Sequence, residues 1–139
     1  LQHFRIAHAL LQQIFQVVHK SKVGFLVVYI VTIASFPICT EIGYAAFSGC
    51  TSLSQIYAPQ CTSISGAAFY SCRNLVSVDF SMCTTIENAA FSGCSTLSDL
   101  SFPICQTIGS YAFYHCDALR SILFPSCITI GSYAFVYVL

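Results

Sequence analysis

The chain has 139 residues, a length that fits one domain or one short array of repeats. Charged residues make up only 7% of it and hydrophobic residues 56%, which argues against disorder. Five basic and five acidic residues balance to a net charge of zero, so the chain lacks the clustered basic charge on which nucleic-acid binding depends. Five acids and four histidines also leave few residues for paired-carboxylate catalysis or a metal site.

Residues 1–22 are predicted to form an amphipathic helical cap or leader. Their apolar residues recur at helical spacing: Phe4, Leu11, Ile14, Phe15 and Val18. A cap over the first coil is what a stacked-repeat protein needs for solubility. One alternative is a helix that lies on a membrane or binds a partner, because Arg5, Lys20 and Lys22 suit anionic lipid. Another alternative is that residues 1–22 come from the non-native translation of an upstream region.

Residues 23–38 are predicted to be a degenerate first repeat. Val23–Thr40 is an uncharged run of 18 residues, long enough to raise a membrane span or a signal segment. Five residues nevertheless lie 22 positions before positions that carry an apolar residue or a proline in most later repeats of this chain: Phe25, Val31, Ala34, Phe36 and Pro37. These matches favour a coil with a strand at VVYIV. Contact of residues 1–36 with a membrane is the less favoured alternative.

Residues 39–139 are a 22-residue repeat whose last copy is incomplete. The string AAFSGC at 45–50 recurs as AAFYSC at 67–72, as AAFSGC at 89–94 and as YAFYHC at 111–116, without insertion or deletion. Apolar columns recur in the same register, among them Ile42, Ile64, Ile86, Ile108 and Ile130, and Phe47, Phe69, Phe91, Phe113 and Phe135. Since one unit cannot bury such a face alone, the units must stack as a solenoid.

The second half of each unit has the pattern of a leucine-rich-repeat strand. Leu53-x-x-Ile56-x-Ala58 recurs as Leu97-x-x-Leu100-x-Phe102, which matches L-x-x-L-x-L. The pattern predicts a repeat solenoid of the leucine-rich-repeat type with a parallel β-sheet. The other half, IGYAAFSGC from Ile42, is predicted to be a turn and a short helical or irregular segment on the convex side.

The string FPICQTIGSYAFYHCDALRSILFPSCITIGSYAF, from Phe102, resembles the BspA-like leucine-rich repeats, also called the Treponema pallidum type. The likeness extends over residues 39–139. It implies a right-handed solenoid in a cell-surface or secreted protein, with host matrix or cell-surface proteins as ligands, and no cofactor or catalytic residue. We therefore expect a non-enzymatic protein-binding or adhesion module. A structural spacer of a larger surface protein and an intracellular interaction scaffold are the alternatives.

Nine cysteines recur every 11 residues from Cys39 to Cys127 and so form two columns. Column-mates on adjacent coils would have Cβ atoms about 5 Å apart, wider than the roughly 3.8 Å of a disulfide. Ten intervening residues do not suit a zinc site. The spacing therefore predicts a buried cysteine ladder, with some disulfides or a metal site as alternatives. A catalytic pair of His115 and Cys116 is disfavoured, because neighbouring residues point to different sides.

Positions between the inward residues of each strand face outward from the sheet. The candidate ligand-facing residues there are Gln55, Tyr57, Asp79, Asp99 and Arg120. Tyr57, Asp79 and Asp99 make a small patch in which a tyrosine offers a large contact area at low entropy cost. An ordinary solvated sheet face is the alternative.

Two further features of the repeats bear on partners. Tyr70, Tyr114 and His115 form a second candidate surface on the convex side. The last coil ends in the apolar string AFVYVL without a polar cap. Since an uncapped coil exposes sheet edge and core, we expect a longer array or end-to-end self-association.

Overall fold

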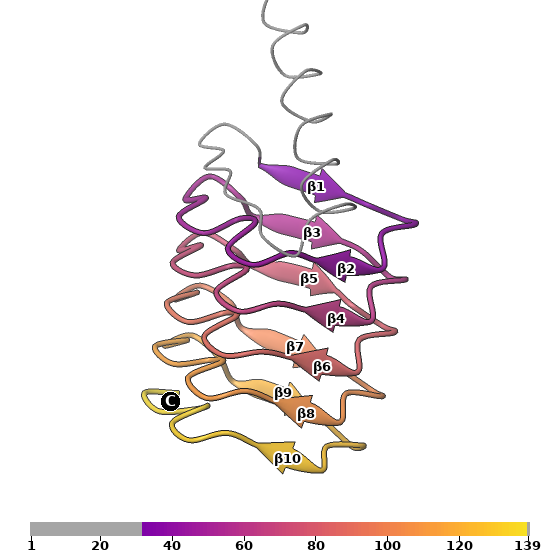
Figure 1. Cartoon of the computed structure of the whole chain (residues 1–139). Helices are drawn as coiled ribbons and strands as arrows, with labels where there is room; N and C mark the ends of the chain where they lie inside the picture. Colours follow the sequence, from indigo (N-terminus) through magenta and orange to yellow (C-terminus); the bar gives the residue numbers. More distant parts are fainter. Residues whose placement is uncertain (1–31, 139) are drawn as a thin grey trace, which may run out of the picture.

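The computed structural model describes residues 32–138, which form a stack of coils, each one repeat long (Figure 1). Most coils contribute one three-residue strand and one two-residue strand. The three-residue strands are β1 (Ile33–Ser35), β3 (Gln55–Tyr57), β5 (Ser77–Asp79), β7 (Asp99–Ser101) and β9 (Ser121–Leu123). The two-residue strands are β2 (Glu41–Ile42), β4 (Ser63–Ile64), β6 (Thr85–Ile86), β8 (Thr107–Ile108) and β10 (Thr129–Ile130). The structure is therefore a parallel β-solenoid, as the repeat predicts.

The three-residue strands are the L-x-x-L-x-L segments, and they pair in parallel at an offset of one repeat. Ala34 lies opposite Ile56, and Ile56 lies opposite Val78. The middle residue of a strand points inward, so Ile56 is 2% exposed while its two neighbours face solvent. Strand β1 takes the same register as the later coils. The predicted cap over 1–22 lies outside the described residues, and the boundaries at 22 and 38 stay predictions.

A second sheet runs beside the first, in the order β10-β8-β6-β4-β2. The sequence analysis placed a turn and a helical or irregular segment from Ile42 onward and did not separate this strand from it. The strand forms because the isoleucine column from Ile42 to Ile108 points inward and is buried, while the residue before each one lies toward the outside. Hydroxyl groups add to the pairing: Thr62 Oγ1 donates to the carbonyl oxygen of Thr40, and Thr84 Oγ1 to that of Thr62.

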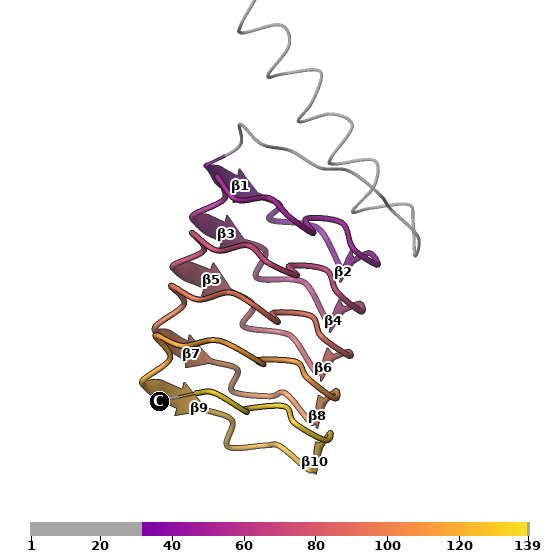
Figure 2. The same ribbon diagram turned by 90° about the vertical axis from the view of Figure 1, so that its left-hand side faces the viewer.

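The segments after the second sheet are turns, and no helix forms between residues 32 and 138. Each such segment bonds to the next coil instead: the Phe47 N–H donates to Ala68 O at 2.7 Å, and the Phe69 N–H to Ala90 O at 2.7 Å. Two residues in each segment have positive φ, for example Ala45 (52°) and Gly49 (74°). Left-handed residues end a helix, so the convex side is irregular. Figure 2 shows these segments stacked in step with the strands.

Phenylalanine rings form the centre of the core. Phe47, Phe69, Phe91, Phe113 and Phe135 stack ring on ring, one per coil, with centroids 5.1–5.3 Å apart and planes within 11° of each other. This spacing follows from the separation of paired strands, about 4.8 Å, and it lies in the favourable range for offset stacking. The stack gives each pair of adjacent coils from Phe47 to Phe135 the same aromatic contact.

The last coil is more exposed than the coils before it. Ile130 is 57% exposed, whereas its counterparts Ile86 and Ile108 are buried, and Ile128 in the same coil is 79% exposed. Apolar residues therefore face outward at this end of the described part of the chain; end-to-end self-association stays a prediction. Nothing within 32–138 is a helix of the length and apolarity that crossing a bilayer requires.

Candidate functional site: a groove where the first sheet opens

The structure places the five candidate residues on the outer face of the first sheet. Tyr57 is 46% exposed and lies opposite Asp79 in the β3–β5 register. Asp79 and Asp99 line the same groove. Tyr57, Gln55 and Arg120 do not line it: Tyr57 and Gln55 lie on β3, one coil before β5, and Arg120 immediately precedes β9. The structure thus brings Asp79 and Asp99 into one groove, places Tyr57 beside Asp79, and leaves Gln55 and Arg120 at the margins.

The groove exists because the first sheet is broken. In the described part of the chain β5 does not pair with β7, so the sheet divides into β1-β3-β5 and β7-β9, while the second sheet continues without interruption. Across the break the second sheet keeps short bonds, such as Gln106 N–H to Thr84 O at 2.8 Å. The coils therefore separate on one side only, where Asp79 and Asp99 lie.

The phenylalanine column beneath the first sheet shows the same opening. The rings of Phe80 and Phe102 are 6.2 Å apart, whereas Phe102 and Phe124 are 5.3 Å apart. At the surface Asp79 turns back on its own segment, since its Oδ1 accepts from the Ser81 N–H at 3.2 Å and from the Ser81 hydroxyl at 2.5 Å. This local side-chain turn lies at the end of β5, where the pairing with β7 is absent.

The groove has a volume of about 410 Å³ and combines apolar walls with two carboxylates. Its lining is Val78, Asp79, Ser81, Asp99, Leu100, Ser101, Pro103, Ser121 and Leu123. Asp99 Oδ2 accepts from the Ser98 hydroxyl at 2.8 Å. Each carboxylate therefore uses one oxygen locally, and no hydrogen bond within 32–138 engages Asp79 Oδ2 or Asp99 Oδ1. With no basic residue in the lining, the groove favours a cation.

The sequence analysis missed the apolar wall and the opening itself. Pro103 belongs to a regular column, and Leu123 stands in the variable outward column of Tyr57 and Asp79; neither position showed that it would border a groove. The signal that could have located it is Ser81, which stands where the other coils have Pro37, Pro59, Pro103 and Pro125. An aspartate two residues before such a serine favours a local side-chain turn.

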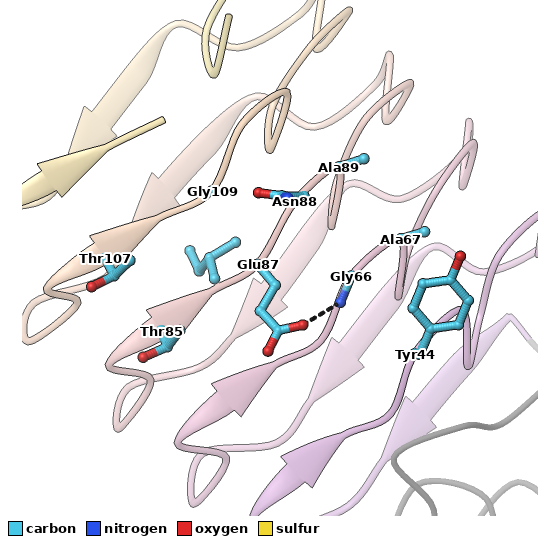
Figure 3. Close-up of a pocket in the computed structure, with 10 residues that line it drawn as sticks. Tyr44, Gly66, Ala67, Thr85, Glu87, Asn88, Ala89, Thr107 and Gly109 are labelled. Carbon is cyan, nitrogen blue, oxygen red and sulfur yellow. Dashed lines mark hydrogen bonds between the residues drawn. The ribbon is translucent and has the colours of Figure 1, made fainter. Parts of the chain in front are cut away.

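A larger groove, of about 570 Å³, lies over the second sheet (Figure 3). Two of its polar side chains, Glu87 and Asn88, are engaged within the chain. Glu87 Oε2 accepts from the Gly66 N–H at 2.9 Å, and Asn88 Oδ1 accepts from the Ser110 N–H at 2.9 Å. These bonds tie one coil to the next, so Glu87 and Asn88 have a structural role.

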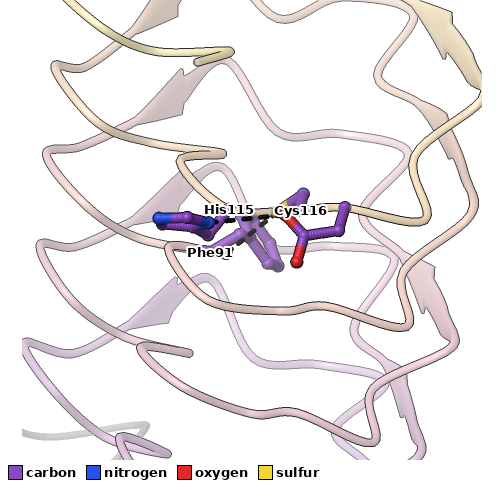
Figure 4. A network of polar contacts seen from close by, with 4 residues as sticks. Phe91, His115 and Cys116 are labelled. Atoms are coloured by element: carbon purple, nitrogen blue, oxygen red, sulfur yellow. Dashed lines mark hydrogen bonds and ion pairs between the residues drawn. The ribbon is translucent and has the colours of Figure 1, made fainter. Parts of the chain in front are cut away.

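Eight of the nine cysteines are buried and Cys127 is half-buried, which matches the ladder that the sequence predicts. In one column each Sγ donates to the carbonyl oxygen two residues on, as in Cys61 to Ser63 at 3.2 Å. In the other column the thiol bonds to the coil before it: Cys116 Sγ donates to Phe91 O at 3.2 Å (Figure 4). Each column therefore satisfies buried carbonyl groups.

His115 and Cys116 do not form a catalytic pair. Cys116 is 0% exposed, and burial raises the pKa of its thiol to about 12. The His115 ring lies on the surface, with Nδ1 3.4 Å from Asp117 Oδ1. A nucleophilic thiol needs a lowered pKa and access to substrate, and Cys116 has neither. Within 32–138 no group of three or more histidine, cysteine or acidic residues is arranged to hold a metal ion.

Comparison with known proteins agrees with this architecture. Residues 28–138 match the family described as the BspA type leucine-rich repeat region, in six copies. The chain belongs to the BspA-type leucine-rich-repeat family. Among curated proteins none matches this BspA-type chain.

Two crystal structures show the same fold. The Treponema pallidum leucine-rich-repeat protein is 27% identical with a TM-score of 0.72, over 76% of this chain and 54% of that one. A leucine-rich-repeat protein from Bacteroides ovatus is 23% identical with a TM-score of 0.54, over 72% of this chain and 36% of that one. This BspA-type chain therefore spans about half the length of the first relative and about a third of the second. Repeats of this kind typically serve as protein-interaction modules without enzymatic activity.

Proposed function

We propose that this chain is a protein-binding module whose groove between β5 and β7 accepts a lysine or arginine side chain of a partner protein. The observation that carries the proposal is the break in the first sheet, which brings Asp79 and Asp99 into one groove. A continuous sheet would leave these carboxylates on a flat, solvated face.

The size and lining of the groove suit a long basic side chain. A volume of about 410 Å³ admits one or two side chains and not a folded element. The alkyl part of a lysine or arginine packs on apolar surface while its charged end stays polar, and Leu123, Pro103 and Val78 supply that surface. The charged end meets the free oxygens of Asp79 and Asp99. A guanidinium group can bond both carboxylates at once.

The residues around the groove supply the rest of the contact. Tyr57 lies opposite Asp79 and is half-exposed, so its ring can cover a partner beside the acidic site. Tyrosines surrounding a buried charged anchor are frequent hot spots of interfaces. Gln55 and Arg120 would lie at the rim, where contacts add specificity more than affinity.

Adhesion and a location at the cell surface or outside the cell are part of the same proposal. The family resemblance supports them, since BspA-type repeats typically occur in surface or secreted bacterial proteins. Host matrix proteins and other cell-surface proteins are the partners we propose.

The test is selection of 12-residue peptides from a display library against the immobilised chain. We expect enriched peptides to carry lysine or arginine, and expect D79N/D99N to lower binding of the best peptide at least ten-fold. The matched control is Glu41→Gln, which removes one carboxylate from the second sheet and should leave binding unchanged. A selection that enriches nothing, or enriches peptides that bind D79N/D99N equally, would favour the spacer reading over this proposal. The selected peptides would then be compared with a panel of immobilised matrix proteins.

A further inference from the structure

The turns on the convex side form a trough that is one coil wide. At two positions of the turn a large or charged residue stands on each of two coils, with a small residue on the coil between them; at a third position only the later coil carries a large residue. The three sets are Tyr70–Ser92–Tyr114, Ser71–Gly93–His115 and Arg73–Ser95–Asp117. All nine residues line one cavity of about 380 Å³. The floor is the coil that carries Ser92, Gly93 and Ser95.

One wall of the trough is fixed by aromatic packing. The His115 ring stacks on Tyr137 at 4.4 Å, and the Tyr114 ring meets His115 edge-on at 4.5 Å. Tyr114 also packs edge-on against Tyr111 at 5.4 Å. Side chains held in this way lose little freedom when a ligand binds. The opposite wall is Tyr70, which is 47% exposed.

The floor of the trough consists of small residues. Gly93 has a φ of +78°, and a Cβ placed there would lie 3.2 Å from Ser71 Oγ. The next residue toward the N-terminus, Ser92, is 6% exposed. Paired coils repeat at about 4.8 Å, so walls two coils apart are separated by about 10 Å at the backbone.

We propose that this trough binds a pyranose ring of a saccharide. A chair-shaped ring has C–H bonds on both faces, which suit the negative faces of tyrosine rings. A contact of about 3.5–4.0 Å between each face of the sugar and a wall, together with the thickness of the puckered ring, fills the gap of about 10 Å between the two walls. A flat aromatic ligand would fill only about 7 Å of it.

The polar groups of the trough match hydroxyl groups, each of which both donates and accepts. Arg73 offers only donors and Asp117 only acceptors, and they stand on opposite walls. The hydroxyls of Ser71 and Ser95 can do either. One positive and one negative charge leave the trough near neutral, which suits an uncharged ligand. The trough is separate from the groove at Asp79 and Asp99, so this inference does not rest on the proposed function.

The test begins with an array of immobilised pyranose oligosaccharides, followed by titration of the corresponding methyl pyranoside. The chain has no tryptophan, so tyrosine fluorescence reports the titration. Stacking energies of this kind predict that Tyr70→Ala and Tyr114→Ala each weaken binding about three- to ten-fold. Ser92→Tyr should abolish it by filling the trough. Tyrosine already occupies the same position of the repeat at Tyr70 and Tyr114, so this variant should fold.

The control is Tyr44→Ala, which removes an exposed tyrosine from another part of the turns and should leave saccharide binding unchanged. Circular dichroism of each variant separates loss of binding from loss of folding. If no glycan on the array retains the chain above the level of Ser92→Tyr, the inference is wrong. Binding that persists in Ser92→Tyr, or selected peptides that compete for Tyr70 and Tyr114 while saccharides do not, would overturn it equally.

Discussion

The sulfur of Cys94 lies 3.2 Å from the carbonyl oxygen of Phe69, one coil earlier, and donates to it. The same carbonyl also accepts from the Cys72 N–H at 3.1 Å. A thiol is small enough for the buried column and still offers a weak donor to a carbonyl group that is cut off from water. The cysteines of this column therefore join adjacent coils through hydrogen bonds.

Replacing one such thiol should lower stability. Cys94→Ala removes a buried sulfur and a hydrogen bond, so we expect a loss of about 1–2 kcal/mol in the free energy of unfolding. Urea unfolding followed by circular dichroism measures it. Cys127→Ala is the matched control, because Cys127 is half-buried, and it should cost about 0.5 kcal/mol or less. Equal losses for the two variants would mean that burial and bonding of Cys94 contribute little.

The thiols should also differ in reactivity between the folded and the unfolded chain. Burial raises the pKa of Cys105 to about 11 and of Cys61 to about 12, which lowers the thiolate fraction at neutral pH. We expect a thiol reagent to modify mainly Cys127 in the folded chain. Under denaturing, non-reducing conditions it should modify close to nine cysteines. A count of one after denaturation would show that the ladder is cross-linked by disulfides.

Stability should fall in alkaline solution. The folded chain keeps its buried thiols protonated, whereas the thiols of the unfolded chain ionise near their ordinary pKa of about 8.5. Above that pH the unfolded state binds fewer protons than the folded state, so the free energy of unfolding decreases as pH rises. The loss continues until the folded thiols ionise, near pH 11–12 for Cys105 and Cys116.

Each raised thiol contributes up to about 1.4 kcal/mol per pH unit in that window. Urea unfolding at pH 7, 9 and 10 measures the slope, and Cys116→Ala should make it shallower. Stability that stays constant from pH 7 to pH 10 would contradict the burial of the ladder.

Two glycines at the same position of the turn should respond differently to substitution. Gly49 and Gly93 both have positive φ, 74° and 78°. A Cβ at Gly49 has open space around it, whereas one at Gly93 would press on Ser71. Gly49→Ala should therefore cost about 1 kcal/mol from backbone strain alone, and Gly93→Ala should cost measurably more. Thermal unfolding of the two variants gives the comparison, and a smaller loss at Gly93 would contradict it.

The repeat predicted most of the fold because an apolar residue that recurs at the same position of every unit indicates that the position is buried. Ile42, Phe47, Leu53 and Ile56 recur at a fixed step, and a fixed step with a fixed apolar residue permits only stacking. The second sheet was harder to foresee. A two-residue strand such as Ser63–Ile64 is too short for an alternating pattern to develop, and its pairing partners are 22 residues away.

The candidate site was predictable in its residues and not in its shape. Outward positions follow from strand alternation, so Tyr57, Asp79 and Asp99 could be named from the sequence. The opening between β5 and β7 depends on a difference of under 1 Å in ring spacing around Phe80 and Phe102. The turn that Asp79 makes with Ser81 lies at the same place. Distances of this size arise from packing and not from periodicity.

The fixed 22-residue register of the coils makes the array modular in length. Residues 83–104 amount to one whole period, so their removal would bring Met82 to Cys105 with every apolar column still in step. The remaining coils would pair with each other in the same register. The coil that carries Ser92 and Gly93 would be lost, together with the strand that carries Asp99. A chain built in this way can gain or lose a recognition surface by the loss of a single unit without having to change its core.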